Sequence, residues 1–143
     1  MTIRPAERVA AVRRFNRFYT QYVGALDDSL LRSAFSLTEV RVLFELAHGP
    51  ATTAHALGQR LGLDAGYLSR ILQRFRRGGL LTREASPQDR REYWLRLTPA
   101  GRAAFMPLDR AASREVARML KSLSDDKQRM LLAAMQTIQR LLD

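Results

Sequence analysis

Cysteine is absent from this 143-residue sequence, and histidine occurs only twice. Without thiols the chain cannot form a disulfide scaffold, a thiolate zinc site or a thiol redox sensor. His48 and His55 show no metal-ligand spacing and no nearby carboxylate pair. The sequence also has no nucleophile elbow and no glycine-rich phosphate loop. These absences predict a protein that is not an enzyme and holds neither a metal nor a cofactor.

Long apolar runs are missing as well. The first ten residues lack the apolar core of a signal peptide, and no stretch approaches the ~18 apolar residues of a membrane span. A chain of 143 residues can bury a core without cross-links but is short for two full domains. We therefore expect one cytoplasmic domain over residues 1–143, with no membrane partner.

Lysine is scarce, and the positive charge is almost entirely arginine. The 24 Lys and Arg outnumber the 14 Asp and Glu to give a net charge of +10, and only Lys121 and Lys127 are lysines. Arginine carries a planar fork of donors that suits phosphates and guanine edges. The charge predicts a polyanionic partner, with nucleic acid favoured over membrane. The alternative is an arginine-rich composition inherited from a GC-rich genome.

The placement of the charge argues against that alternative. Residues 60–102 hold ten Arg and four acids, which is +6 of the total +10 in 43 residues. The remaining 100 residues carry 14 cations and 10 acids and are close to balanced. The excess is therefore concentrated in one segment.

Apolar spacing and capping residues predict the elements of the fold. Helices are expected over 8–30, 37–47, 54–61, 65–77, 99–123 and 125–142, and strands over 80–83 and 92–97 with a basic tip at 85–91. Ser36 with Glu39 has the pattern of a capping box, Asp64, Thr98 and Ser124 are good N-caps, and Pro107 predicts a kink or break. The order α-α-α-α-β-β-α-α predicts a mainly α, winged helix-turn-helix fold with a small β-hairpin wing.

The helix over 65–77 carries the functional prediction. Winding it at 100° per residue places Leu68, Ile71, Leu72 and Phe75 on one side. The opposite side and its edges carry Gly66, Tyr67, Ser69, Arg70, Gln73, Arg74, Arg76 and Arg77. This face has no acid after the Asp64 cap, and its residue types read bases and hold phosphates in a major groove. The alternative is an ordinary solvated face, although such a face usually mixes both signs.

Residues 89–101 read Asp-Arg-Arg-Glu-Tyr-Trp-Leu-Arg-Leu-Thr-Pro-Ala-Gly. They resemble the wing signature D-x-R-x-x-x-L-x-L-T-x-x-G of the MarR (multiple antibiotic resistance regulator) family. The segment from Gly62 to Leu80 resembles the family's recognition helix. The aromatic first helix and residues 64–72 are similar to the regulator half of MarR–acetyltransferase fusions. Because the sequence ends at Asp143, we expect no acetyltransferase domain.

The resemblance implies a transcriptional regulator, a repressor, that binds a pseudo-palindromic operator in the nucleoid as a homodimer. It implies dimerisation helices over 5–33 and 99–142 and a DNA-binding lobe over 36–98. By family position Arg91 reaches into a minor groove, and Asp89 braces the wing by pairing with a nearby Arg. The alternative for Asp89 is a plain turn former. The candidate DNA-binding residues are Thr53, Gly66, Tyr67, Ser69, Arg70, Gln73, Arg74, Arg77, Arg90 and Arg91.

The terminal helices carry more apolar residues than a small winged-helix lobe can cover. Burial across a two-fold axis is the economical explanation, and an intramolecular helix hairpin is the alternative. Members of the family also bind small aromatic acids in a cleft between the lobe and the dimer helices. The candidate cleft residues here are Phe15, Tyr19, Tyr22, Phe44 and His48, and the alternative is that these aromatics are core. Arg and Tyr side chains are expected to hold the acid group of such a ligand.

Two other function classes remain open. A sequence-tolerant architectural DNA-binding protein would share the localised charge. A regulatory or interaction module separated from a catalytic acetyltransferase domain would share the first helix and the recognition helix.

Overall fold

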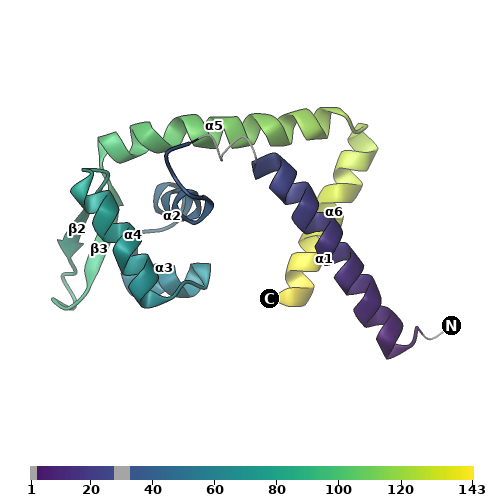
Figure 1. Ribbon diagram of the computed structural model, residues 1–143, viewed down its shortest axis with the longest axis horizontal. Coiled ribbons are helices and arrows are strands. Elements are labelled where there is room, and N and C mark those ends of the chain that lie inside the picture. Colours follow the sequence, from purple (N-terminus) through teal and green to yellow (C-terminus); the bar gives the residue numbers. More distant parts are fainter. Residues whose placement is uncertain (1–2, 28–32) are drawn as a thin grey trace.

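The computed structural model describes residues 3–27 and 33–143 (Figure 1). The elements follow in the order α1 (Pro5–Asp27), α2 (Leu37–His48), β1 (Thr52–Thr53), α3 (Ala54–Leu61), α4 (Ala65–Arg77), β2 (Leu81–Ala85), β3 (Tyr93–Leu97), α5 (Pro99–Lys121) and α6 (Asp125–Leu142). Figure 1 shows a lobe made of α2, α3, α4 and the strands at one end of α5, with α1 and α6 toward the other end. The predicted mainly α, winged helix-turn-helix class is confirmed.

The sheet contains one strand more than predicted. β1 pairs antiparallel with β3, which pairs antiparallel with β2, so the sheet order is β1-β3-β2. The predicted order without β1 is therefore incomplete. β1 has only two residues, Thr52 and Thr53, which are too few to show an alternating pattern. They become a strand only by pairing with Leu95 and Trp94. β2 also begins one residue later and ends two residues later than the predicted 80–83.

The two 23-residue helices, α1 and α5, differ from the prediction. α1 begins at Pro5 rather than residue 8 and reaches Asp27, while Leu30, which belonged to the predicted stripe, lies outside the described residues. α5 is helical through Pro107, so the predicted break there is wrong. The predicted N-caps Ser36, Asp64, Thr98 and Ser124 are all observed, and Ser36 forms the full capping box with Glu39.

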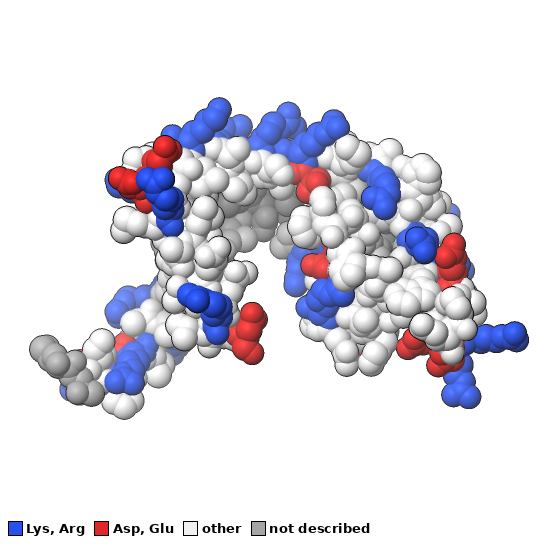
Figure 2. Space-filling view, turned by 180° about the vertical axis from the view of Figure 1, so that it is seen from behind, with Lys and Arg blue, Asp and Glu red and all other residues white. Residues whose placement is uncertain are grey.

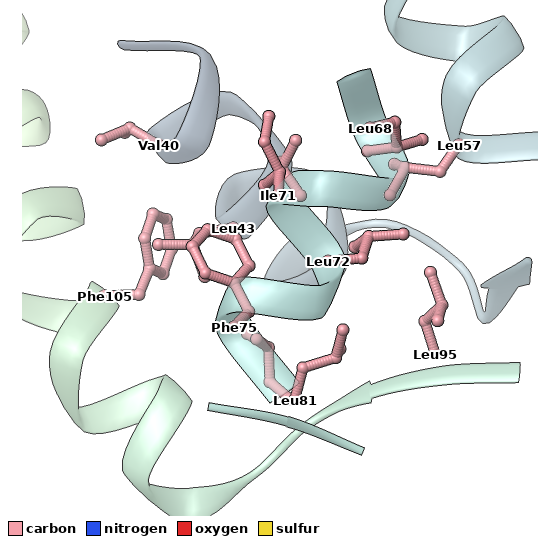
Figure 3. Close-up of a cluster of buried hydrophobic side chains, with 12 residues drawn as sticks. Val40, Leu43, Leu57, Leu68, Ile71, Leu72, Phe75, Leu81, Leu95 and Phe105 are labelled. Carbon is pink, nitrogen blue, oxygen red and sulfur yellow. The ribbon is translucent and has the colours of Figure 1, made fainter. Parts of the chain in front are cut away.

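The core of the lobe gathers one apolar face from each surrounding element (Figure 3). Phe75 of α4 is 1% exposed and contacts the Phe35 ring edge-on at a centroid distance of 6.0 Å. Phe105 brings α5 into the same cluster. The buried apolar residues are Val40, Val42, Leu43, Leu57, Leu68, Ile71, Leu72, Phe75, Leu81, Leu95, Leu97 and Phe105. The stripe predicted for α4 is thus the stripe that faces the core.

The start of α5 is fixed against the turn that follows α4. The Thr98 N–H donates to the Leu80 carbonyl at 3.0 Å, and the Thr98 hydroxyl donates to the Gly79 carbonyl at 2.6 Å. A Cβ on Gly101 would lie 2.1 Å from the Leu80 oxygen, so only glycine allows the first turn of α5 to approach this closely. This junction sets the direction in which α5 leaves the lobe.

Many large apolar residues of the terminal helices α1 and α6 are exposed in the single chain. α1 packs against α5, but α6 has no buried residue. Met130, Leu141 and Leu142 are 71%, 78% and 82% exposed. The other large apolar residues exposed on these helices are Val9, Val12, Phe15, Phe18, Tyr19, Leu132 and Ile138.

Candidate nucleic-acid interface

The recognition helix α4 is positioned by its two ends and by its buried stripe. Gly62 takes the left-handed conformation, with φ 64°, and makes the short turn from α3. The Asp64 carboxylate then accepts the Tyr67 N–H at 3.0 Å and starts α4. Since Leu68, Ile71, Leu72 and Phe75 are locked in the core, the opposite side of the helix must face solvent.

The exposed side of α4 holds most of the predicted DNA-binding residues. Gly66, Tyr67, Ser69, Arg70, Gln73 and Arg77 are all exposed. The Arg70 guanidinium lies 6.0 Å from the centre of the Tyr67 ring, at the outer limit of a cation–π contact. A Cβ on Gly66 would come within 3.3 Å of the Asp64 cap. The first two turns of α4 therefore offer donors and an open backbone to a partner.

Thr53 is engaged elsewhere. It is half-buried, pairs with Trp94 in the sheet and caps α3 by accepting the Ala56 N–H at 3.3 Å. These contacts give Thr53 a structural role whether or not it touches DNA.

Arg74 is held by a buried acid that the sequence analysis did not connect to it. Its guanidinium forms an ion pair with Glu39, the capping-box residue of α2, which is 6% exposed. Burial alone would raise the pKa of the Glu39 carboxyl, but hydrogen bonds from Ser36 and the Arg74 guanidinium together outweigh it and lower the pKa below its usual value. The pair ties α4 to α2, and Arg74 therefore positions the helix. No local pattern could reveal it, because the partners are 35 residues apart.

The wing tip is closed by two side chains. The buried Ser86 hydroxyl accepts the N–H groups of Gln88 and Asp89 at 3.3 and 3.4 Å. The Asp89 carboxylate accepts the Arg91 N–H at 2.9 Å. Within residues 33–143 Asp89 forms no ion pair with an arginine side chain, so its observed contact is the turn-forming one. Arg90 and Arg91 are exposed at this tip.

The candidate cleft residues divide into two groups. Phe44 lines a groove of about 430 Å³ between α2 and α5, together with Phe105 and Leu108. His48 lies beside it, with its ring 4.7 Å from Phe44 and its Nε2 2.9 Å from Asp109 Oδ2, a carboxylate partner that the sequence analysis missed. Phe15, Tyr19 and Tyr22 do not line this groove in the described chain. They stack along α1, with centroids of neighbouring rings 5.7 and 6.4 Å apart.

Among the described residues, the groove has one acidic residue and no basic one. Asp109 and Ser113 are its polar residues in this part of the chain, and no described Arg or Lys lines it. The described residues of one chain therefore do not supply the predicted arginine partner for a carboxylate ligand. Tyr22 has a buried hydroxyl without a hydrogen-bond partner among the described residues.

The described residues contain no group of three or more His, Cys, Asp or Glu that could hold a metal ion. Nor does the described part of the chain include a helix with the length and apolar character needed to cross a membrane.

Comparison with known proteins places these features in a family. Residues 35–92 match the MarR family. A putative transcriptional regulatory protein for the hcr operon of Thauera aromatica is 26% identical over 133 residues, a match that spans 93% of this chain and 74% of the relative. Residues 35–92 contain α2, α3, α4, β2 and the wing tip, whereas β3 and the core residues Leu95, Leu97 and Phe105 lie beyond them.

Solved structures share the fold along the chain. PcaV, a transcriptional regulator from Streptomyces coelicolor solved with its natural ligand, has a TM-score of 0.70 and 23% identity over 100% of this chain and 99% of its own. Streptococcus pneumoniae FabT, solved in complex with DNA, has a TM-score of 0.78 and 21% identity over 92% of this chain and 96% of its own. At these identities the likeness establishes the fold.

The Arg74–Glu39 pair predicts a pH-dependent contribution to stability. Glu39→Gln keeps the shape of the capping box but removes the charge, so it should lower the free energy of unfolding at neutral pH by about 1–2 kcal/mol. Because the folded-state pKa of Glu39 is lowered, the contribution is present above the ordinary carboxyl pKa. It is lost as pH falls through the folded pKa, and the gap between wild type and variant should close there. Urea unfolding across acid and neutral pH measures it.

Glu84→Gln is the matched control. Its partner Arg96 lies 3.1 Å away, and both side chains are more than 60% exposed, so the loss should stay below about 0.5 kcal/mol. A Glu39→Gln protein as stable as wild type at neutral pH would show that the pair does not hold α4.

Proposed function

Because residues 35–92 of this chain belong to the MarR family, we propose that the protein is a transcriptional regulator that binds double-stranded DNA in a sequence-specific way. The observation that carries the proposal is the face of α4. It presents Arg70, Gln73 and Arg77 outward from a helix whose opposite side is locked in the core. The similar protein from Thauera aromatica is named as a putative transcriptional regulatory protein, which supports this class over an enzyme.

The proposed binding mode uses both parts of the lobe. α4 lies in a major groove, where the Arg70 and Gln73 side chains meet base edges. The wing reaches the neighbouring minor groove, and Arg91 enters it, since a narrow minor groove attracts arginine. Ser86 and Asp89 hold the tip in the turn that displays Arg91. In this binding mode the protein acts at the chromosome, in the cytoplasm.

We propose that it acts as a homodimer. Most of the stability of a helix in a protein comes from packing its apolar face, yet α6 buries none of its residues in the single chain. Its exposed apolar residues and those of α1 would be covered by the same helices of a second copy. A two-fold dimer presents two α4 helices and therefore fits a pseudo-palindromic operator. Repression follows if the bound dimer blocks access of the polymerase to the promoter.

A ligand that releases the DNA is the remaining part of the proposal. The groove of about 430 Å³ between α2 and α5 is within the range of small-molecule sites and lies where the lobe joins α5. An aromatic ring fits the Phe44 and Phe105 side chains, while an acid group needs a cation that the described groove residues do not include. The PcaV structure contains that protein's natural ligand, which supports an effector in this fold.

The DNA-reading role predicts a loss of specificity in Arg70→Ala. On the best duplex selected from a random pool the variant should bind about 1–3 kcal/mol more weakly, and it should relax the preference at one base position per half-site. Its binding to a scrambled duplex should change less, because the lost contact reads a base. Fluorescence anisotropy with both duplexes measures the ratio.

Arg114→Ala is the control, because it removes the same charge from the exposed surface of α5. Equal losses for Arg70→Ala on both duplexes would make Arg70 a phosphate contact. A wild type with no preference between the duplexes would favour the architectural alternative.

The effector predicts a paired response. At least one small aromatic carboxylate should raise the melting temperature and lower the affinity for the selected duplex, with a coupling of about 1–3 kcal/mol. Phe44→Ala should weaken both effects, because it removes one wall of the groove. A panel of aromatic acids that moves neither quantity would leave a regulator controlled by its abundance alone.

A further inference from the structure

A second basic feature lies beside the recognition helix. A groove of about 490 Å³ runs between the C-terminal half of α4 and β2. Its lining contains three arginines, Arg76, Arg77 and Arg83, together with Gln73, Thr82 and Leu81. Arg76 and Arg83 are not among the DNA-binding residues predicted from the sequence.

This groove is positive because the strands separate their charges by face. Along β2, Arg83 shares a face with the buried Leu81, whereas Glu84 points to the other face. There Glu84 is paired with Arg96 at 3.1 Å. No acidic residue lines the groove, and none of its three guanidinium groups belongs to an ion pair among the described residues. Three unneutralised cations therefore share one concave surface.

Arg83 is held in place by an aromatic ring. Its guanidinium carbon lies 4.4 Å from the centre of the Tyr93 ring on the neighbouring strand. Stacking occupies the flat face of the guanidinium and leaves its N–H edges free to donate. Tyr93 thus limits the conformations of an otherwise exposed side chain and keeps the donors of Arg83 at the groove.

The position of the groove identifies its ligand. In the proposed binding mode α4 lies in a major groove and the wing tip in the neighbouring minor groove. A sugar–phosphate strand separates the two grooves of a duplex, so that strand must pass between α4 and the hairpin. The space between them is the arginine-lined groove.

We propose that Arg76, Arg77 and Arg83 form a clamp for the DNA backbone phosphates at this crossing, with Tyr93 positioning Arg83. The inference rests on the proposed function and adds to it a set of contacts that fix register without reading sequence. Occupation of the clamp requires α4 and the wing to engage adjacent grooves at the same time.

Arg83→Ala tests the clamp on a mixed-sequence duplex, with affinity measured over a range of salt concentrations. The variant should bind several-fold more weakly, and the slope of log affinity against log salt should fall by about 1. The variant that replaces all three arginines with alanine should lower the slope by about 3. Thermal melting of each variant establishes that it is folded.

Three matched variants test the clamp further, one for the position of the charge and two for the stacking on Tyr93. Arg96→Ala removes the same charge from the other face of the same hairpin and should leave the slope unchanged. Tyr93→Leu should lose part of the affinity that Arg83→Ala loses, whereas Tyr93→Phe keeps the ring and should bind as wild type does. Equal slopes for Arg83→Ala and wild type, or equal losses for Arg83→Ala and Arg96→Ala, would overturn the clamp.

Two further outcomes distinguish the claims. A wild type that binds no duplex would overturn the proposed function itself. Inorganic phosphate should displace DNA from wild type more readily than from Arg83→Ala at matched ionic strength, because the clamp predicts that phosphate and the DNA backbone compete for the same arginines. Phosphate that binds wild type but not Arg83→Ala, and that leaves the DNA affinity of wild type unchanged, would make the groove a site for free phosphate and overturn its assignment to the DNA backbone.

Discussion

The arrangement of the molecule depends on the contact between the Leu80 carbonyl and the start of α5. That carbonyl accepts the Thr98 N–H, and it lies so near Gly101 that no side chain fits there. The turn after α4, the base of the wing and the first turn of α5 are therefore one rigid junction. Because α5 connects the lobe to α6, this junction fixes where the terminal helices lie relative to α4 (Figure 1). The spacing of two recognition helices in a dimer would follow from it.

The acidic and basic residues of the lobe have different roles. In the lobe, acids are used for structure: Asp64 caps α4, Glu39 holds Arg74, and Glu84 pairs with Arg96. Among the described residues, other arginines on α4, in the groove beside β2 and at the wing tip have no acidic partner. Figure 2 shows basic side chains projecting at the wing end of the lobe, and also a hollow between the lobe and the terminal helices. The apolar surfaces of α1 and α6 suit a second copy, whereas the arginines suit DNA.

The features predicted correctly from sequence are local ones. The Ser36–Glu39 capping box, the Asp64 cap and the buried stripe of α4 each depend on residues within a few turns, so their patterns are visible in the chain. β1 was missed because it exists only through its pairing with β3. Pro107 did not break α5, since the continuous helix is favoured by its contacts with the lobe and α1.

The parts of the site that escaped prediction are contacts between distant segments. Arg74 meets Glu39, and His48 meets Asp109, only after the core has brought α2 against α4 and α5. The predicted ligand cleft is incomplete for the same reason. The prediction grouped the α1 aromatics with Phe44 by residue type, whereas in the described part of one chain only Phe44 among them lines the groove. Predicting the groove beside β2 requires knowing which face of the sheet each strand residue occupies. A five-residue strand does not reveal this without its partner strand.

The central claim is that two copies of the chain place two α4 helices on one symmetric stretch of DNA. The most direct measurement is to select bound duplexes from a random pool and to determine the mass of the protein on the enriched duplex. A symmetric dimer predicts an inverted repeat with half-sites about one helical turn, ~34 Å, or a multiple of it apart, bound by two chains of 16.3 kDa. A single unrepeated site bound by one chain, or a pool with no enriched sequence, would contradict it.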